Sequence, residues 1–400
     1  MFNTPWMPIL RSLLRHRALA LLIVVEVALA FAIVANALHL IVRLADDLRI
    51  ETGQAEAELL TVELRAMQRV EDAQPLSNED LRRIRALPGV RAASITSQVI
   101  YGSSSNSSGV HSAPNGAGQR LMATTYRGDE HLLQTMGLKL IAGRGFKPEE
   151  VMVRGPDASM PSIIINRSMA EALFKGQSAL GKPLYVYGDK PSTVVGVVEQ
   201  LTRTSPKQRR DAHAMLQPAA ESYRSGKYLL RVDPAQHAAV AKAVEALIPQ
   251  VDNRRWVHQV RSVSDMRSDY YAKDRAMVGL LAGVCAALLL VTAFGIVGLA
   301  SFWVEQRTRM IGIRRALGAT QAQITRYFQA ENALLTGLGV LIGMAAAIAL
   351  SQWMRRDDLP MLPWPYLPIG AALLLLLGQL AVLAPARRAA HVPPALAMRA

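Results

Sequence analysis

The sequence lacks almost everything that a catalytic or metal-binding chain requires. Its 400 residues include a single cysteine, Cys285, which excludes any disulfide within the chain. The eight histidines are scattered, and none pairs with another at i+3 or i+4 on a predicted helix. No serine lies in a nucleophile elbow. We therefore expect no catalytic residue and no metal site, and we expect Cys285 to pack as a small hydrophobe in its apolar run.

A complete phosphate-binding loop is also missing. Gly176–Pro183, with the sequence GQSALGKP, follows the pattern G-x-x-x-x-G-K-[ST] up to its last position. There Pro183 offers no hydroxyl for a magnesium ion. The residues before it are expected to form a helix, whereas a P-loop follows a strand. We interpret the segment as a turn between a helix and a strand, and we expect this chain to bind no cofactor.

Long apolar runs, by contrast, are abundant. Four of them are predicted to be transmembrane helices, at residues 18–44, 277–304, 330–354 and 367–384. The first is too long for a signal peptide and lacks a clear cleavage site. The first two exceed the ~20 residues that cross a bilayer. Either tilt or continuation as a stalk under an external domain accounts for this excess length.

Acidic residues are scarce beside these runs, and arginines predict the orientation of the chain. The segments 1–17, 305–329 and 385–400 are rich in arginine, whereas the short loop 355–366 is not. Under the positive-inside rule, both termini and the segment 305–329 are cytoplasmic, and residues 45–276 lie outside. The formal charge of +14 therefore indicates topology rather than nucleic-acid binding. The expected location is a bacterial inner membrane, in contact with its lipids.

The external residues 45–276 are expected to form a mixed α/β domain. Strands are predicted at 58–67 and 91–100, with a helix between them for which Ser77 is the expected N-cap. This β-α-β order suggests helices packed on one face of a sheet. The Ser/Gly/Asn-rich residues 101–119 are predicted to be a surface loop. Further along, the expected elements are a strand entering a helix, a hairpin and two more strands, at residues 161–174, 182–201, 227–233 and 254–260.

The fold class that follows is a membrane protein with four transmembrane α-helices and a large mixed α/β extracytoplasmic domain inserted between spans 1 and 2. Before the first span, residues 1–17 are expected to form an amphipathic helix along the inner leaflet, with Thr4 as N-cap and Pro5 at the first helical position.

The segment between spans 2 and 3 carries the most specific local pattern. Met310, Ile313 and Leu317 fall on one helical face, and the two arginines at 314 and 315 project away from it. Gly318 is a natural C-cap, and the pattern T-x-x-Q that begins at Thr320 is expected to start a second helix leading into span 3. An apolar face exposed in this segment needs a surface to bury against. A partner protein and the bilayer surface are both candidates.

At these residues the chain resembles the FtsX/MacB-type ABC transporter permeases. Their signature after span 2, E-R-x-x-E-I-G-I-R-[RK]-A-L-G-A, is similar to EQRTRMIGIRRALGA here. The segments FQAEN, GLGVLIG and PARRAAHVPPALAMR resemble the rest of the membrane part. INRSMAEALFKGQSALGKPLYVYGDKPSTVVGVVEQL resembles the periplasmic core domain of the MacB branch.

This resemblance implies a non-catalytic permease subunit that dimerises and binds a cytosolic ATPase, which holds the ATP and magnesium. Without a fused ATPase domain, a separate chain must supply it. ATP would drive closure of the permease, and this movement would be passed to the periplasmic domain by mechanotransmission. The domain would then move a drug, peptide or similar substrate towards a periplasmic adaptor and an outer-membrane channel. The residues implied in ATPase coupling are Arg307, Arg309, Met310, Ile311, Gly312, Ile313, Arg314, Arg315, Ala316, Leu317, Gly318 and Ala319.

Three questions stay open at this level. The family usually has an acid where this chain has Met310, which is compatible either with a heterodimer of two permeases or with ordinary divergence. An FtsX-like regulator that activates a periplasmic enzyme without transport is the alternative function. Glu26 and Glu331 are acids in or near predicted spans, where a functional role is the default expectation. For Glu26 we favour helix–helix hydrogen bonding over proton transfer, and Glu331 lies at the entrance of span 3.

Overall fold

The computed structural model describes residues 17–68, 71–116, 118–153, 160–186, 188–207, 213–354 and 362–391. The amphipathic helix expected at residues 1–17 lies outside these ranges except for its last residue. The chain divides into two compact units. One contains residues 1–46 and 274–400, and the other contains residues 47–273.

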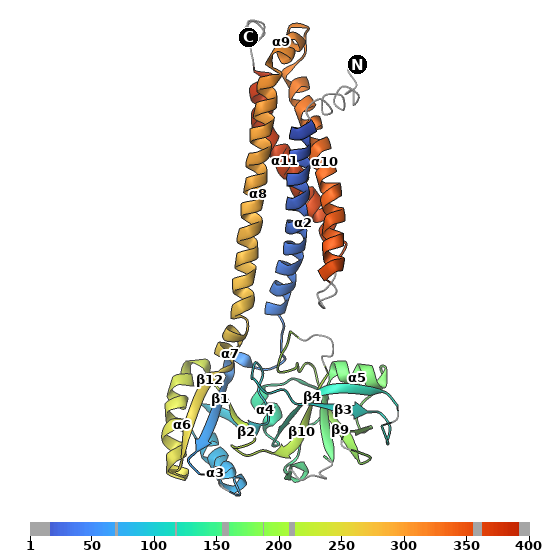
Figure 1. Cartoon of the computed structure of the whole chain (residues 1–400). Coiled ribbons are helices and arrows are strands. Elements are labelled where there is room, and N and C mark those ends of the chain that lie inside the picture. The colour runs from blue at the N-terminus through green and yellow to red at the C-terminus, as the bar shows by residue number, and fades with distance from the viewer. Residues whose placement is uncertain are drawn as a thin grey trace. The chain divides into compact units, whose positions relative to one another are not determined.

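The first unit is helical. Among the described residues, four helices are long and apolar enough to cross a membrane, as expected (Figure 1): α2 (Arg17–Leu48), α8 (Ala272–Gln306), α10 (Gln321–Met354) and α11 (Tyr366–Ala390). Each extends beyond its apolar run, because flanking polar residues continue the backbone hydrogen bonds. At ~1.5 Å per residue, the 35 residues of α8 measure roughly 52 Å, well above the ~30 Å of a bilayer core.

Two glycines on α10 allow α2 to approach closely. A Cβ atom at Gly339 would lie 2.8 Å from Cβ of Val27, and one at Gly343 would lie 2.6 Å from the carbonyl oxygen of Ala28. The two glycines are four residues apart, the small-xxx-small spacing that brings membrane helices into backbone contact. The core around them also contains Phe31, which is fully buried.

The second unit contains two sheets. The first is antiparallel with the strand order β12-β1-β11-β2. Two helices pack on one face of it through a shared core, as expected, but α4 (Leu132–Met136) and α7 (Val263–Tyr270) pack against the other face, so the expectation that one face alone carries helices was wrong. On α6, Val240, Val244, Leu247 and Ile248 follow helical spacing and face the sheet. The bounds are β1 (Leu59–Ala66), β2 (Val90–Thr96), β11 (Lys227–Val232), β12 (Arg255–Ser262), α3 (Gln74–Arg85) and α6 (His237–Val251).

The second sheet closes on itself. Its strands follow the order β4-β3-β8-β9-β7-β10, and β10 pairs again with β4, so six strands form a ring. The strands β5 and β6 add to β9 and β10, and α5 covers the core of the ring. The bounds are β3 (Ser107–His111), β4 (Arg120–Gly128), β5 (Leu140–Gly143), β6 (Met152–Val153), β7 (Ser162–Asn166), β8 (Pro183–Tyr185), β9 (Pro191–Val198), β10 (Ala214–Ala220), α4 (Leu132–Met136) and α5 (Arg167–Phe174).

Two further expectations for this unit were wrong. Ser77 is not the N-cap of its helix, because α3 begins at Gln74 with a proline in its first turn. Instead, the Ser77 hydroxyl is buried, donates to the Ala73 carbonyl at 2.7 Å and accepts from the Tyr223 amide at 3.0 Å. The loop expected at 101–119 contains β3, whose pairing with β4 provides the ordering that its composition does not predict. The hairpin is confirmed as β8 and β9, and Gly176–Pro183 spans the turn between α5 and β8.

A buried ion pair joins α3 to the first sheet. The Asp80 carboxylate accepts from two nitrogens of Arg255, at 2.6 and 3.0 Å, and both side chains are fully buried. Tyr228 also donates to Asp80, at 2.5 Å. Burial and the nearby Asp80 charge raise the pKa of Tyr228 well above its usual value of 10, so its hydroxyl stays a donor at neutral pH.

Candidate functional site

The segment between α8 and α10 forms a short helix with a defined end. It is α9 (Thr308–Ala316), and it stops at a glycine whose φ of +94° an L-residue rarely adopts. The amide of that residue, Gly318, donates to the Arg315 carbonyl, and the amide of Ala319 donates to the Arg314 carbonyl, both at 3.0 Å. These two bonds form a Schellman motif, which satisfies carbonyls that would otherwise be left open at the helix end.

The next helix begins at once. The Thr320 amide donates to Oε1 of Gln323 at 2.9 Å, and the Gln323 amide donates to the Thr320 hydroxyl at 3.3 Å. This is the reciprocal capping box that the sequence predicts, and α10 starts at the following residue, Gln321. The two caps hold the turn between α9 and α10 in one conformation.

One side of α9 is fixed to α10 and α11. Ile311 is buried in a small core with Ile324 and Phe328 of α10 and with three alanines near the end of α11. Both arginines of the signature fold back onto the same helices. The Arg314 guanidinium lies 4.8 Å from the ring centre of Tyr327, and Arg315 donates to the Ala390 carbonyl at 2.9 Å. We conclude that α9, α10 and the end of α11 form one packed body.

The other side of α9 is exposed and apolar. Met310, Ile313 and Leu317 are 39%, 46% and 83% exposed, respectively. These are the three residues that the sequence places on one helical face. Complete burial of one such side chain contributes about 1.5–3 kcal/mol of favourable free energy. Binding of another surface to this face of α9 would therefore be favourable.

A buried ion pair lies where α8 ends and α9 begins. The Arg307 Nη1 atom donates to both carboxylate oxygens of Glu331, at 3.0 and 2.8 Å. The side chains are 8% and 1% exposed, respectively. The guanidinium carbon also lies 5.4 Å from the ring centre of Trp303. Glu331 is therefore paired rather than interfacial, and Arg307 connects α8 and α9 to α10.

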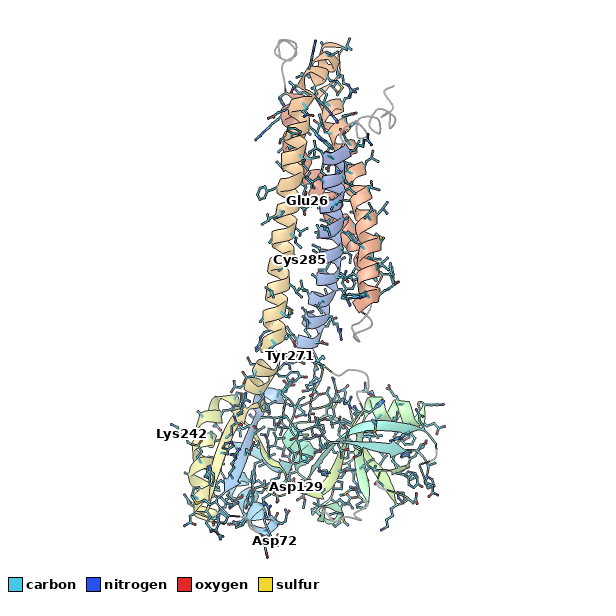
Figure 2. All side chains as sticks on the ribbon, viewed as in Figure 1. Glu26, Asp72, Asp129, Lys242, Tyr271 and Cys285 are labelled. Carbon is cyan, nitrogen blue, oxygen red and sulfur yellow. The ribbon has the colours of Figure 1, made fainter. Side chains whose placement is uncertain are left out.

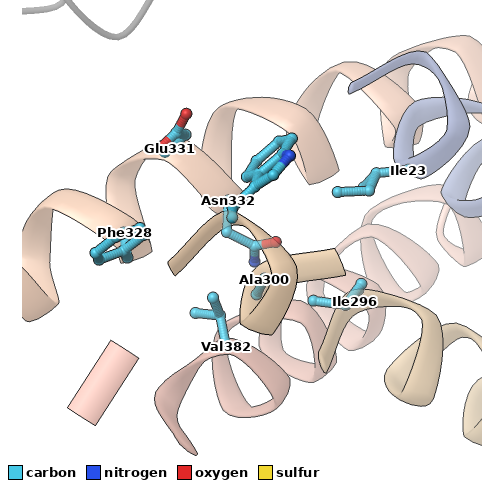
Figure 3. A pocket seen from close by; sticks show the side chains of 8 residues that line it. Ile23, Ile296, Ala300, Phe328, Glu331, Asn332 and Val382 are labelled. Atoms are coloured by element: carbon cyan, nitrogen blue, oxygen red, sulfur yellow. The ribbon is translucent and has the colours of Figure 1, made fainter. Parts of the chain in front are cut away.

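Next to this pair is a small cavity among all four long helices (Figure 3). Its lining residues are Ile23, Ile296, Ala300, Trp303, Phe328, Glu331, Asn332 and Val382, and its volume of about 10 Å³ is close to what one water molecule requires. Among the described residues, the Trp303 Nε1 and Asn332 Nδ2 atoms have no hydrogen-bond partner. Gly378 of α11 lies against the Asn332 side chain, because a Cβ atom at Gly378 would be 3.3 Å from Asn332 Nδ2. The interior of the helical unit is therefore polar around this cavity.

Glu26 of α2 lies elsewhere (Figure 2). Glu26 is half-buried and its carboxylate lies against Gly295 of α8, where a Cβ atom would clash with the Oε1 atom of Glu26. No hydrogen bond joins Glu26 to the described part of the chain. The residues described also contain no group of three histidine, cysteine, aspartate or glutamate side chains suited to a metal ion.

Two families match this sequence. The MacB-like periplasmic core domain matches residues 20–247, more than half of the chain, and the FtsX-like permease C-terminal family matches residues 282–394. The chain belongs to the FtsX-like ABC transporter permeases with a MacB-like periplasmic core domain. The second match covers most of α8 and all of α9 and α10.

Individual relatives are similar over part of this permease. The uncharacterised ABC transporter permease YknZ of Bacillus subtilis is 25% identical over 66% of this chain and 66% of its own length. The macrolide export ATP-binding/permease protein MacB of Rhodospirillum rubrum is 29% identical over 61% of this chain. The match spans only 38% of that MacB protein. The solved periplasmic region of MacB from Actinobacillus actinomycetemcomitans aligns with 54% of this chain and 94% of its own, with a TM-score of 0.36 and 16% identity.

Proposed function

We propose that this chain is the membrane subunit of an ABC exporter whose ATPase is a separate cytosolic protein. The exposed face of α9, defined by Met310, Ile313 and Leu317, is the surface on which the ATPase docks. The observation that carries this proposal is the contrast between the two sides of α9. One side is packed against α10 and α11, and the other presents apolar side chains from a capped, rigid helix.

The topology supports a cytosolic partner. The segment from Arg307 to Ala319 is rich in arginine, which the positive-inside rule assigns to the cytoplasm of a bacterial inner membrane. Both termini then lie in the cytoplasm and residues 45–276 in the periplasm. The apolar residues that α8 exposes, such as Leu290, Val291 and Phe294, meet lipid or a second permease subunit.

In this proposal, ATP hydrolysis by the partner moves the helices of this chain, and the exported molecule does not pass through a channel in this chain. The ATPase pushes α9, and α10 and α11 move with it because they share one core. Movement of the spans is passed to the periplasmic domain, which drives an exported drug, peptide or similar molecule towards a periplasmic adaptor and an outer-membrane channel. The proposed export activity agrees with the name of the R. rubrum relative, a macrolide export protein.

The test is co-purification of the full-length chain from native membranes. Replacing Leu317 with aspartate adds a charge where the side chain is most exposed. Loss of one buried leucine alone weakens binding about 10- to 100-fold, from its ~1.5–3 kcal/mol of burial energy. We expect wild-type chain to co-purify with a protein that hydrolyses ATP, and Leu317→Asp to lose it.

Gln321→Asp is the matched control, since it adds the same charge at an exposed position in the first turn of α10, where an acid suits the helix N-terminus. This variant should keep the ATPase. If Leu317→Asp retained the ATPase at the wild-type ratio, α9 would not be the docking helix. A periplasmic hydrolase recovered in place of an adaptor would favour regulation without transport.

A further inference from the structure

A partly buried arginine of the second unit binds residues of the same unit at the end of α2. Arg267 lies in α7 (Val263–Tyr270), directly before α8. Its Nη2 atom donates to the carbonyl oxygens of Leu48, at 2.8 Å, and Ile50, at 3.3 Å. Leu48 is the last residue of α2, so the guanidinium satisfies carbonyls that the helix end leaves open. A cation is also the charge favoured at a helix C-terminus.

The same guanidinium is held by an acid from a third segment. The Arg267 Nη1 atom donates to the Glu56 carboxylate at 2.8 Å, in the short 3-10 helix η1 (Glu56–Glu58) that precedes β1. Glu56 also accepts from the hydroxyls of Tyr101, at 3.0 Å, and Thr52. Burial lowers the pKa of Arg267, but the hydrogen bond and charge of Glu56 outweigh this and leave the pKa raised. We call Arg267, Glu56 and the carbonyls of Leu48 and Ile50 the Arg267 cluster.

Aromatic rings pack around the cluster. The ring centres of Tyr101 and Tyr270 lie 5.2 Å apart, and those of Tyr270 and Tyr271 lie 4.9 Å apart. Tyr271 is the residue between α7 and α8 (Figure 2), and burial raises its pKa to about 12. The Lys207 ammonium lies 4.6 Å from the centre of Tyr270. Tyr101 adopts a φ of 59°, which is costly for a bulky residue and which the surrounding contacts maintain.

The cluster also touches the main core of the second unit. That core contains Tyr101, Met266 and Tyr271 together with Leu59 from the first sheet and Leu216 from the ring. Leu48 packs against it as well. The end of α2, the residues that precede α8, and both sheets therefore meet in one packed region.

We propose that Arg267 is a positioning residue that holds the end of span 1 and the start of span 2 at a fixed separation and joins both to the periplasmic core. The role of this contact in transmitting movement rests on the proposed function, in which movement of either span would reach the two sheets through Arg267. Without the guanidinium, only the apolar packing of Leu48 would hold the end of α2 to α7. The spans would still respond to the ATPase, but the domain would follow their movement less closely.

The test measures that separation in the full-length chain, in lipid nanodiscs and without any partner. A Cys285→Ser background leaves no other thiol. Arg49→Cys and Lys273→Cys place spin labels at two exposed positions, one after α2 and one at the start of α8. We expect a narrow distance distribution with Arg267 present, and a broader one with a longer mean distance in Arg267→Met.

Arg261→Met is the matched control. Arg261 pairs with Asp269 of α7 but binds no carbonyl of α2, so its removal should leave the distribution narrow. Arg267→Lys has one ammonium for three acceptors and should fall between wild type and Arg267→Met. If Arg267→Met does not fold, Glu56→Gln removes the charge but keeps an acceptor for Tyr101, and should broaden the distribution to a lesser degree.

An unchanged distribution in the folded Arg267 variants, or equal broadening in Arg261→Met, would overturn the proposal. Because the measurement needs no ATPase, this outcome is separate from failure of the proposed function. Conversely, loss of the docking role of α9 would leave the spin-label result as expected.

Discussion

Replacing Glu331 with glutamine should destabilise the helical unit by about 3–5 kcal/mol, the usual cost of removing one partner of a buried ion pair. The Arg307 side chain is 8% exposed and that of Glu331 1%, so water reaches little of the Arg307 charge that remains unpaired. Glutamine has nearly the same shape and can still accept one hydrogen bond from Nη1. The loss should therefore lie at the lower end of that range, and it should arise from charge rather than from packing.

The same reasoning predicts that removing both charges is less harmful than removing one. In Arg307→Met/Glu331→Leu, two apolar side chains take the place of a buried pair, a change that is often neutral or stabilising. Both single variants should be less stable than the double variant. The coupling free energy of the pair is the loss of stability in the double variant minus the sum of the losses in Arg307→Met and Glu331→Leu, which a double-mutant cycle isolates.

The assay is equilibrium unfolding of the full-length chain in mixed micelles by increasing fractions of sodium dodecyl sulfate. Trp303 lies against Arg307, so tryptophan fluorescence reports on the site itself when the other four tryptophans are replaced with phenylalanine. Additive losses from the two single changes would refute the reasoning, because they would mean that the two charges do not stabilise each other. A Glu331→Gln variant as stable as wild type would refute it as well.

Three further changes test other parts of the structure. Gly318→Ala should cost about 1–2 kcal/mol through its left-handed backbone alone, because nothing lies within 4 Å of the added Cβ; thermal denaturation measures the cost. Asp80→Asn should lower the stability of the periplasmic domain by about 3–5 kcal/mol, because the buried charge of Arg255 is left without its counter-ion. Unfolding by denaturant measures this loss of stability. Hydrogen bonding to Lys227 lowers the pKa of Glu63 from its usual 4.5, although burial opposes it. This stabilisation is complete above pH 4.5 and is lost as the pH falls through the lower native pKa, which melting curves from pH 6 to pH 3 should show.

Each of these has a control in the same chain. Gly337→Ala also adds a Cβ in open space, but within α10, where alanine should stabilise rather than destabilise. Glu79→Gln removes an exposed pair next to Asp80 and should change stability little. Glu63→Gln should make melting less dependent on acid than in wild type. If Asp80→Asn were as mild as Glu79→Gln, the buried pair would not stabilise the domain.

The sequence predicts the membrane spans and the α9 turn well, for reasons that are local. Hydropathy and arginine distribution act over single segments, and the caps at Gly318 and Thr320 are formed by residues within five positions of each other. The apolar face of α9 follows from helical spacing alone. The exposure of that face is visible in the structure, whereas its docking role remains a proposal.

What the sequence could not reveal depends on distant contacts. Arg307 precedes α9 and Glu331 lies in α10, 24 positions later, so the sequence marked Arg307 for topology and ATPase coupling but did not indicate its ion-pair partner. The strand β10 contains Pro218, which argues against a central strand, yet it pairs on both sides in the ring. Arg267 and Leu48 are separated by 219 positions. No local pattern marks such a pair.

The closed ring of six strands has a mechanical consequence. Each strand is paired with a neighbour on both sides, although β3 and β8 meet at one residue pair only, so no strand can slide without breaking pairing on both sides. The ring also offers no continuous free edge for pairing with another chain during a cycle of movement. Side-chain packing and single backbone hydrogen bonds, such as that from the Ser97 amide to the Arg127 carbonyl, join the ring to the antiparallel sheet. When the domain deforms, this contact should therefore change before the ring does.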